Sequence, residues 1–129
     1  MPARIDHVIL AVNDVRASVA FYEHILGFTH EGQDGPFSVV RVSEDFTLQL
    51  APWGTKGGEH LAFALSKEEF DAVLARIRAA GLRYGDSFHT VGQQAGPGRE
   101  NGARGAAPTL YFFDPSEHLL EIRYYEERP

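Results

Sequence analysis

The chain has 129 residues, of which 43% are hydrophobic and 12% aromatic, a composition that suits one compact domain with its own core. It contains no cysteine, which excludes disulfides, thiolate metal ligands and cysteine nucleophiles, and its formal net charge of −6 argues against a nucleic-acid partner. No run reaches the roughly 20 apolar residues of a membrane span, and "MPARIDH" lacks the apolar stretch of a secretory signal. We therefore expect a cytoplasmic protein without a membrane partner.

The first half of the chain predicts a strand, a helix and three further strands. The strand "HVILAV" begins at His7, and Asn13-Asp14 caps a helix that stops at Gly27. The strand candidates "FTHE", "FSVVRV" and "FTLQLA" follow, separated by the turns "GQDGP" and "SED". The order of elements in this half is βαβββ.

The second half repeats this order. "HLAFAL" begins at His60, and Ser66 with Glu69 forms a capping box for a helix that stops at Gly81. The strand candidates are "LRYG", "TLYFF" and "HLLEIRYY". We expect an α+β fold in one domain, made of two repeated βαβββ modules at about 1–54 and 55–129. The mixed sheets would curl into a cup with the helices outside.

Four of these strands each carry one potential metal ligand, namely His7, Gln49, His60 and Glu121. Successive strand side chains point to opposite faces, and each of these four alternates with bulky apolar residues of the other face. If the less bulky faces line the cup, the four side chains converge near a pseudo-twofold axis.

Three segments, "DHVILAVNDVRASVAFYEHILGF", "EHLAFAL" and "LYFFDPSEHLLEIRYY", resemble the vicinal oxygen chelate superfamily over nearly the whole chain. That superfamily includes glyoxalase I, fosfomycin-resistance thiol transferases, extradiol dioxygenases, methylmalonyl-CoA epimerases and bleomycin-resistance proteins. The resemblance implies that His7, His60 and Glu121 hold a divalent metal, and that Glu121 also acts as a catalytic base. Glyoxalase-like members add a carboxylate from the fourth strand, where this chain has Gln49, a weaker neutral donor. Zn, Ni, Co, Mn and Fe(II) are all compatible with such ligands.

Each candidate ligand also has a structural explanation. A lone strand histidine is usually hydrogen-bonded structure, and Gln49 can instead line the cavity. Glu121 can form a salt bridge to a nearby arginine such as Arg123. In "DPSEH", Glu117 stands where relatives usually have glycine, so a turn that needs a positive φ would form less readily here.

Residues 85–108, "GDSFHTVGQQAGPGRENGARGAAP", form a glycine-rich stretch that is long for a connector, and such loops are commonly lids or disordered. Arg99 and Arg104 in it are candidates to bind a substrate carboxylate or phosphate, or are simply solvated. Tyr111 and Trp53 are candidate apolar walls of a substrate cavity.

These features predict a divalent-metal-dependent enzyme of the glyoxalase type, in which the ion acts as a Lewis acid on a small molecule with two adjacent oxygens. The motif does not fix the reaction, because lyases or isomerases, thiol transferases, epimerases and dioxygenases of the superfamily share it. One alternative is a metal-free protein that sequesters a drug or other ligand, as bleomycin-resistance relatives do. Another is a degenerate member that serves only as an interaction module.

We also expect a homodimer, because each half-cup has exposed sheet edges. The connector "PWGTKGGE" leaves two arrangements open. Either one chain closes its own cup, or the first module pairs with the second module of its partner.

Overall fold

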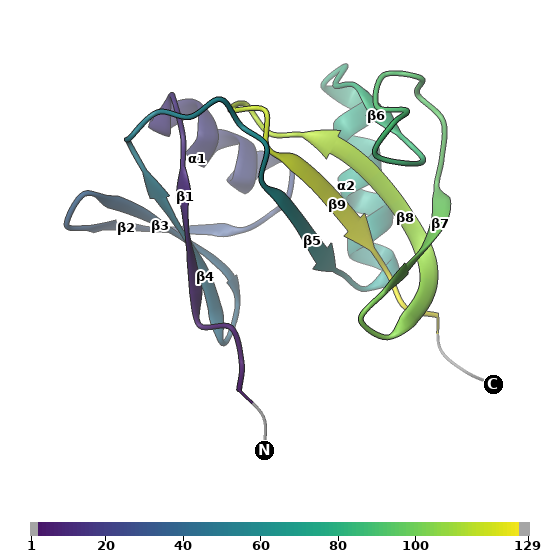
Figure 1. Ribbon diagram of the computed structural model, residues 1–129, viewed down its shortest axis with the longest axis horizontal. Helices are drawn as coiled ribbons and strands as arrows, with labels where there is room; N and C mark the ends of the chain where they lie inside the picture. Colours follow the sequence, from purple (N-terminus) through teal and green to yellow (C-terminus); the bar gives the residue numbers. More distant parts are fainter. Residues whose placement is uncertain (1–2, 127–129) are drawn as a thin grey trace. The chain divides into compact units, whose positions relative to one another are not determined.

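The computed structural model describes residues 3–126 of the chain. It divides into two compact units, Met1–Gly57 and Gly58–Pro129, and the division falls inside the connector "PWGTKGGE". Figure 1 shows the strands and the helix that belong to each unit. Among the described residues, no helix is long and apolar enough to cross a membrane.

The first unit contains one helix and a four-stranded mixed sheet. Its elements are β1 (His7–Ala11), α1 (Val15–His24), β2 (Thr29–Asp34), β3 (Phe37–Ser43) and β4 (Phe46–Ala51). The strand order is β1-β4-β3-β2, with β1 parallel to β4 and the other pairs antiparallel. The predicted order βαβββ is confirmed, although β2 continues past Glu31. A register shift between His30 and Gly32 lets the pairing run on to Asp34.

Local sequence signals explain the start of α1 and the side of the sheet that forms the core. The Asp14 carboxylate accepts a hydrogen bond from the Ala17 amide at 3.0 Å, which satisfies one of the unpaired donors of the first turn. Leu10, Leu48 and Leu50 are fully buried, as alternation predicts for the bulky faces of β1 and β4.

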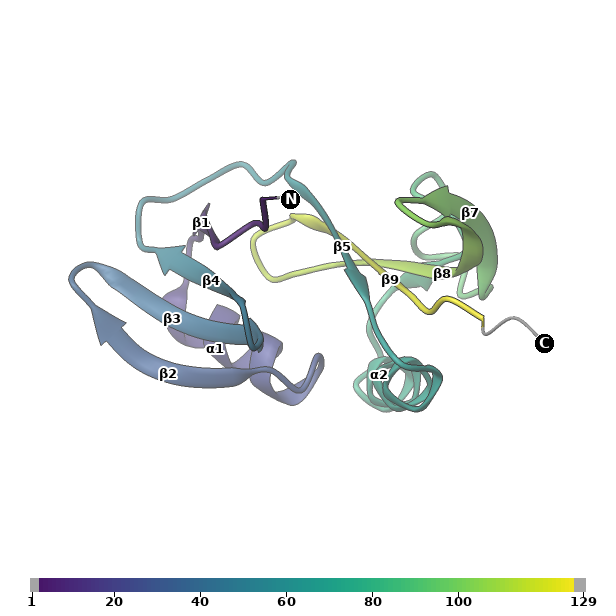
Figure 2. The same cartoon turned by 90° about the horizontal axis from the view of Figure 1, so that it is seen from below.

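The second unit contains one helix and a five-stranded mixed sheet. Its elements are β5 (His60–Ala64), α2 (Lys67–Ala79), β6 (Tyr84–Gly85), β7 (Gly98–Gly102), β8 (Gly105–Phe113) and β9 (Leu119–Arg123). The strand order is β5-β9-β8-β6, with β5 parallel to β9, and β7 pairs with β8. In Figure 2, α2 is seen end-on and lies on one face of this sheet. Its N-cap is Ser66, which accepts from the Glu69 amide at 3.1 Å.

The long connector of the second unit differs from the expected lid or disordered loop. Its last part forms β7 and the start of β8, an antiparallel hairpin with a turn at 103–104. Its first part is held by side chains, since Gln94 accepts from the Tyr84 amide at 2.7 Å and donates to the Leu82 carbonyl at 3.1 Å. The polar, glycine-rich composition conceals this strand because β7 gains its stability from pairing with β8 and not from its own propensity.

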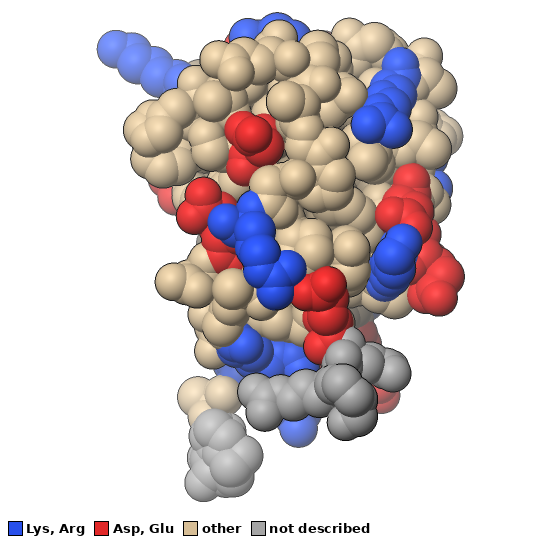
Figure 3. Space-filling model, turned by 90° about the vertical axis from the view of Figure 1, so that its right-hand side faces the viewer, with Lys and Arg blue, Asp and Glu red and all other residues tan. Residues whose placement is uncertain are grey.

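The fold is α+β and glyoxalase-like, with two mixed sheets and one helix per sheet, as the sequence predicts. Figure 3 shows one face of the molecule, on which basic and acidic side chains are interspersed.

Candidate metal centre

In each unit the first strand exposes the face that carries its histidine. In β1, Ile9 shares the face of His7 and is 44% exposed, whereas Leu10 on the opposite face is 1% exposed. In β5, His60 and Ala62 are exposed, whereas Phe63 is buried. The alternation predicted from the sequence is therefore confirmed for both strands.

His60 and Glu121 lie together in the second unit. The His60 Nε2 atom is 3.1 Å from Glu121 Oε1, and the Glu121 side chain is almost fully buried. The two residues belong to neighbouring parallel strands, in which Ala62 pairs with Glu121. Strand pairing thus brings an imidazole and a carboxylate that are 61 residues apart into direct contact.

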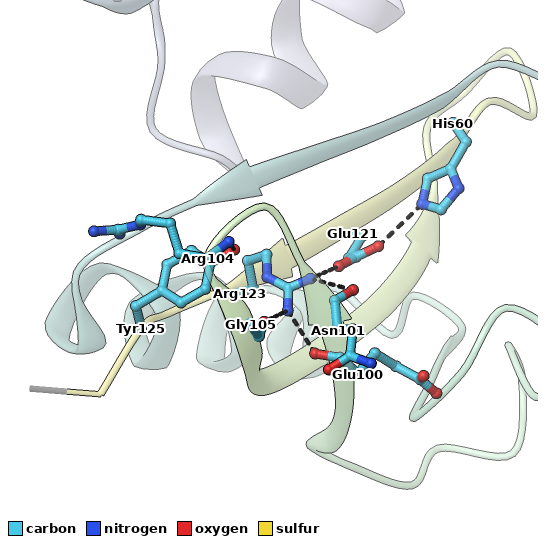
Figure 4. A network of polar contacts seen from close by, with 8 residues as sticks. All are labelled: His60, Glu100, Asn101, Arg104, Gly105, Glu121, Arg123 and Tyr125. Atoms are coloured by element: carbon cyan, nitrogen blue, oxygen red, sulfur yellow. Dashed lines mark hydrogen bonds and ion pairs between the residues drawn. The ribbon is translucent and has the colours of Figure 1, made fainter.

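The second oxygen of Glu121 is bound by Arg123. Arg123 Nη1 donates to Glu121 Oε2 at 2.9 Å, and the arginine is 4% exposed. The salt bridge that the sequence offered as the structural explanation of Glu121 is therefore present. It occupies one carboxylate oxygen and leaves the other directed at His60 (Figure 4).

Tyr111 completes this cluster. It pairs with Glu121 across β8 and β9, and its ring centroid is 6.0 Å from that of His60. Burial raises the pKa of Tyr111 to about 12, and the charge and hydrogen bond of Glu121 add to the effect. Tyr111 therefore keeps its proton at neutral pH and is a hydrogen-bond donor beside the carboxylate.

The contact between His60 and Glu121 has the dimensions of two ligands of one ion. Two donors that each lie about 2.0–2.2 Å from a metal are about 2.8–3.6 Å apart for angles between a right angle and the tetrahedral angle. The observed separation of 3.1 Å lies in this range, and it is also the length of a direct hydrogen bond between the two side chains. An imidazole and a single carboxylate oxygen are donors suited to a divalent transition metal, so these residues fit such an ion.

The start of β5 is supported by a residue to which the sequence gave no role. His118 is 1% exposed, and its Nδ1 accepts a hydrogen bond from the Glu59 amide at 3.2 Å. The Leu119 amide donates to the Glu59 carbonyl at 2.8 Å. His118 thus anchors the residue before His60 to the start of β9. Its position in "DPSEH" was visible in the sequence, but its burial was not.

In the first unit, His7 and Gln49 lie on the same face of the sheet. Asp6 Oδ2 is 2.7 Å from His7 Nδ1, which leaves Nε2 of the ring available to a ligand. Gln49 pairs with Ile9, one step along the face from His7, and is partly buried. Within the described part of either unit, no three histidine or carboxylate side chains gather closely enough to hold an ion.

The predicted substrate contacts lie in different surroundings. Arg99 forms an exposed ion pair with Glu126 at 2.8 Å. The Arg104 guanidinium lies 4.1 Å from the centre of the Tyr125 ring, a residue to which the sequence gave no role. Trp53 belongs to the first unit, is 62% exposed and packs edge-on against Phe37 at 5.6 Å. Of the three that belong to the second unit, only Tyr111 pairs with Glu121.

The chain is similar to several enzymes. It is 30% identical to glutathione transferase FosA of Serratia marcescens over 92% of this chain and 78% of that protein. It is 25% identical to metallothiol transferase FosB of Shouchella clausii over 92% of this chain and 77% of that protein. Among solved structures, oxidase ChaP-H2 matches with a TM-score of 0.79 and 31% identity over 98% of this chain and 96% of its own.

These names agree with the expectation of an enzyme. Residues 4–122 match the family model described as Glyoxalase/Bleomycin resistance protein/Dioxygenase superfamily. That range spans both units and contains all four predicted ligands, so the family resemblance noted in the sequence is confirmed. The chain belongs to the Glyoxalase/Bleomycin resistance protein/Dioxygenase superfamily.

Proposed function

We propose that the protein is a divalent-metal-dependent enzyme that acts on a small molecule with adjacent oxygen atoms. Its ion would be held by His60 and Glu121 together with His7, and Gln49 would be a weaker donor. The observation that carries the proposal is the 3.1 Å contact between His60 Nε2 and Glu121 Oε1, in a carboxylate whose other oxygen is already bound. When bound, such an ion polarises a substrate oxygen as a Lewis acid.

The surrounding side chains have separate roles in this proposal. The Tyr111 hydroxyl, which stays protonated, donates to the Glu121 carboxylate, and its ring supplies an apolar wall beside the ion. Glu121 holds the ion and is the candidate for proton transfer. Arg99 and Arg104 supply positive charge for an anionic group of the substrate, and Trp53 supplies an apolar wall. Zn, Ni, Co, Mn and Fe(II) all suit these ligands.

Metal analysis of the protein, purified without an affinity tag, tests the metal site. We expect a stoichiometric divalent ion in the parent and loss of most of it in His7→Ala, His60→Ala and Glu121→Ala. Gln49→Ala should have a milder effect, because a neutral amide binds a cation less strongly than a carboxylate. The proposed site is wrong if two of the first three variants, folded by circular dichroism, bind metal like the parent.

An activity screen tests the reaction. FosA and FosB are named as transferases, a relative in Listeria innocua as fosfomycin resistance protein FosX, and ChaP-H2 as an oxidase. The screen should therefore pair fosfomycin with thiols and a catechol with dioxygen. A methylglyoxal–thiol adduct covers the glyoxalase reaction. Glu121→Ala is the control, because turnover that survives in it would not depend on the proposed ion.

A metal-free ligand-binding protein is the second candidate. The observation that favours it is that no three histidine or carboxylate side chains gather within the described part of either unit. Titration with divalent ions separates the two candidates. A protein that binds no ion, yet binds a small cationic drug stoichiometrically, would sequester its ligand without chemistry.

We further propose that the working unit is a homodimer. Either each chain closes its own cup, or the first module of one chain pairs with the second module of its partner. Inactive His7→Ala and Glu121→Ala proteins, unfolded together and refolded, separate the arrangements. If modules are exchanged between chains, one site of each mixed dimer keeps all its ligands and metal binding returns. Mixed dimers without recovery would place each site within one chain.

A further inference from the structure

The buried guanidinium of Arg123 connects the Glu121 carboxylate to the β7–β8 hairpin (Figure 4). Nη1 donates to Glu121 at 2.9 Å and to the Asn101 carbonyl at 3.2 Å. Nη2 donates to the Glu100 carbonyl at 2.6 Å and to the Gly105 carbonyl at 3.4 Å. One side chain therefore contacts a carboxylate and three main-chain oxygens from both sides of the hairpin turn.

The hairpin is shaped to receive this side chain. A Cβ atom added to Gly102 would collide with Arg123 Nη1, so only glycine leaves room for the guanidinium at this point. The φ of Gly102 lies outside the left-handed region, so an alanine there would clash with the Arg123 guanidinium and the Tyr125 hydroxyl without straining the backbone. The ring of Tyr125 lies 5.2 Å from the guanidinium carbon and covers it.

We propose that Arg123 is a positioning residue for the metal ligand Glu121, an inference that rests on the proposed metal site. Arg123 occupies Oε2, so only Oε1 is presented to an ion beside His60. The three carbonyl contacts fix the guanidinium, and the guanidinium in turn fixes the rotation of the carboxylate. Partners of this kind orient metal ligands, and their loss typically lowers metal affinity by about 10–100-fold.

A simpler role for Arg123 is to neutralise a buried carboxylate. The two roles differ in what they require. Neutralisation needs only a positive charge near Glu121, which a lysine provides. Positioning needs the planar fork of arginine, because a lysine ammonium cannot reach the carboxylate and the hairpin carbonyls in one fixed geometry.

Three variants separate these roles. Arg123→Lys keeps the charge and loses the fork. Gly102→Ala keeps Arg123 and every charge but displaces the guanidinium from its place. Asn101→Ala is the matched control on the same hairpin, because it changes a side chain and leaves the main-chain carbonyl that Arg123 uses. Circular dichroism and thermal melts verify the fold of each, and Gly102→Ala carries the test if Arg123→Lys does not fold.

Cobalt(II) is the probe, with affinity measured by calorimetry and ligand geometry by the visible absorption of the bound ion. We expect Arg123→Lys and Gly102→Ala to bind cobalt about 10–100-fold more weakly and with an altered spectrum, because Glu121 is then free to rotate. Asn101→Ala should stay within about twofold of the parent, as an ordinary surface change does. Parental affinity and spectrum in both test variants would overturn the positioning role while leaving the metal site intact. A parent that binds no cobalt, although folded, would overturn the proposed site and this inference together.

Discussion

Replacement of Glu117 by glycine should stabilise the protein. Glu117 lies in the turn between β8 and β9 with a φ of 65°, a left-handed conformation that costs a residue with a Cβ about 1–2 kcal/mol. The turn fixes it there, because its amide donates to the Asp114 carbonyl at 3.0 Å and its carbonyl accepts from the Gly58 amide at 3.2 Å. This is the position at which the sequence suggested that a glycine would form the turn more readily.

The net effect follows from three terms. Glycine removes the strain of the left-handed conformation. It also makes the unfolded chain more flexible, which lowers the free energy of unfolding by about 0.5–1 kcal/mol. The side chain also loses an exposed contact of 4.0 Å with Arg83, and such pairs contribute little. We expect the variant to be about 0.5–1 kcal/mol more stable, which corresponds to a rise in Tm of about 2–4 °C.

Urea unfolding followed by circular dichroism measures this difference. Glu117→Ala is the control, because it loses the contact with Arg83 but keeps the Cβ atom, and it should stay within about 0.5 kcal/mol of the parent. A glycine variant no more stable than the alanine variant would show that the turn is not strained at Glu117.

The Tyr111 hydroxyl should make the stability of the metal-free protein sensitive to alkaline pH. Its pKa of about 12 in the folded protein exceeds the value of about 10 in the unfolded chain. Its contribution to the free energy of unfolding is therefore present below pH 10 and is lost as the pH rises toward 12. The stability difference between the parent and Tyr111→Phe should therefore shrink over that range, and a constant difference would contradict the assignment. Metal affinity should fall with decreasing pH, because histidine ligands must be unprotonated to bind an ion. Isothermal titration at pH values from about 8 to 5 measures it, and a flat profile would exclude histidine ligation. Asp14→Ala should lower the free energy of unfolding by about 1 kcal/mol through loss of the cap on α1, and an unchanged urea midpoint would show that the cap contributes nothing.

Local pattern was sufficient to predict most of the fold. Apolar alternation identified the buried faces of β1 and β5, and the caps Asp14 and Ser66 marked where both helices begin. The same alternation placed Glu121 and Arg123 on one face of β9, which is how the salt bridge between them could be anticipated. These signals depend on residues two to four positions apart, so they are complete in the sequence.

The sequence did not reveal β7, and only the structure shows why Glu121 keeps a single oxygen for His60. Both results depend on strand pairing between distant segments: β7 is stabilised by β8, and Arg123 reaches main-chain carbonyls of a hairpin about 20 residues earlier. His118 shows the same limit, since its burial against Glu59 requires β5 and β9 to lie side by side. The sequence by itself determined which side chains are available for chemistry and on which face of each strand they stand. Tertiary structure decided which partners they meet, because a buried polar group takes its hydrogen bonds from whatever strand packing brings next to it.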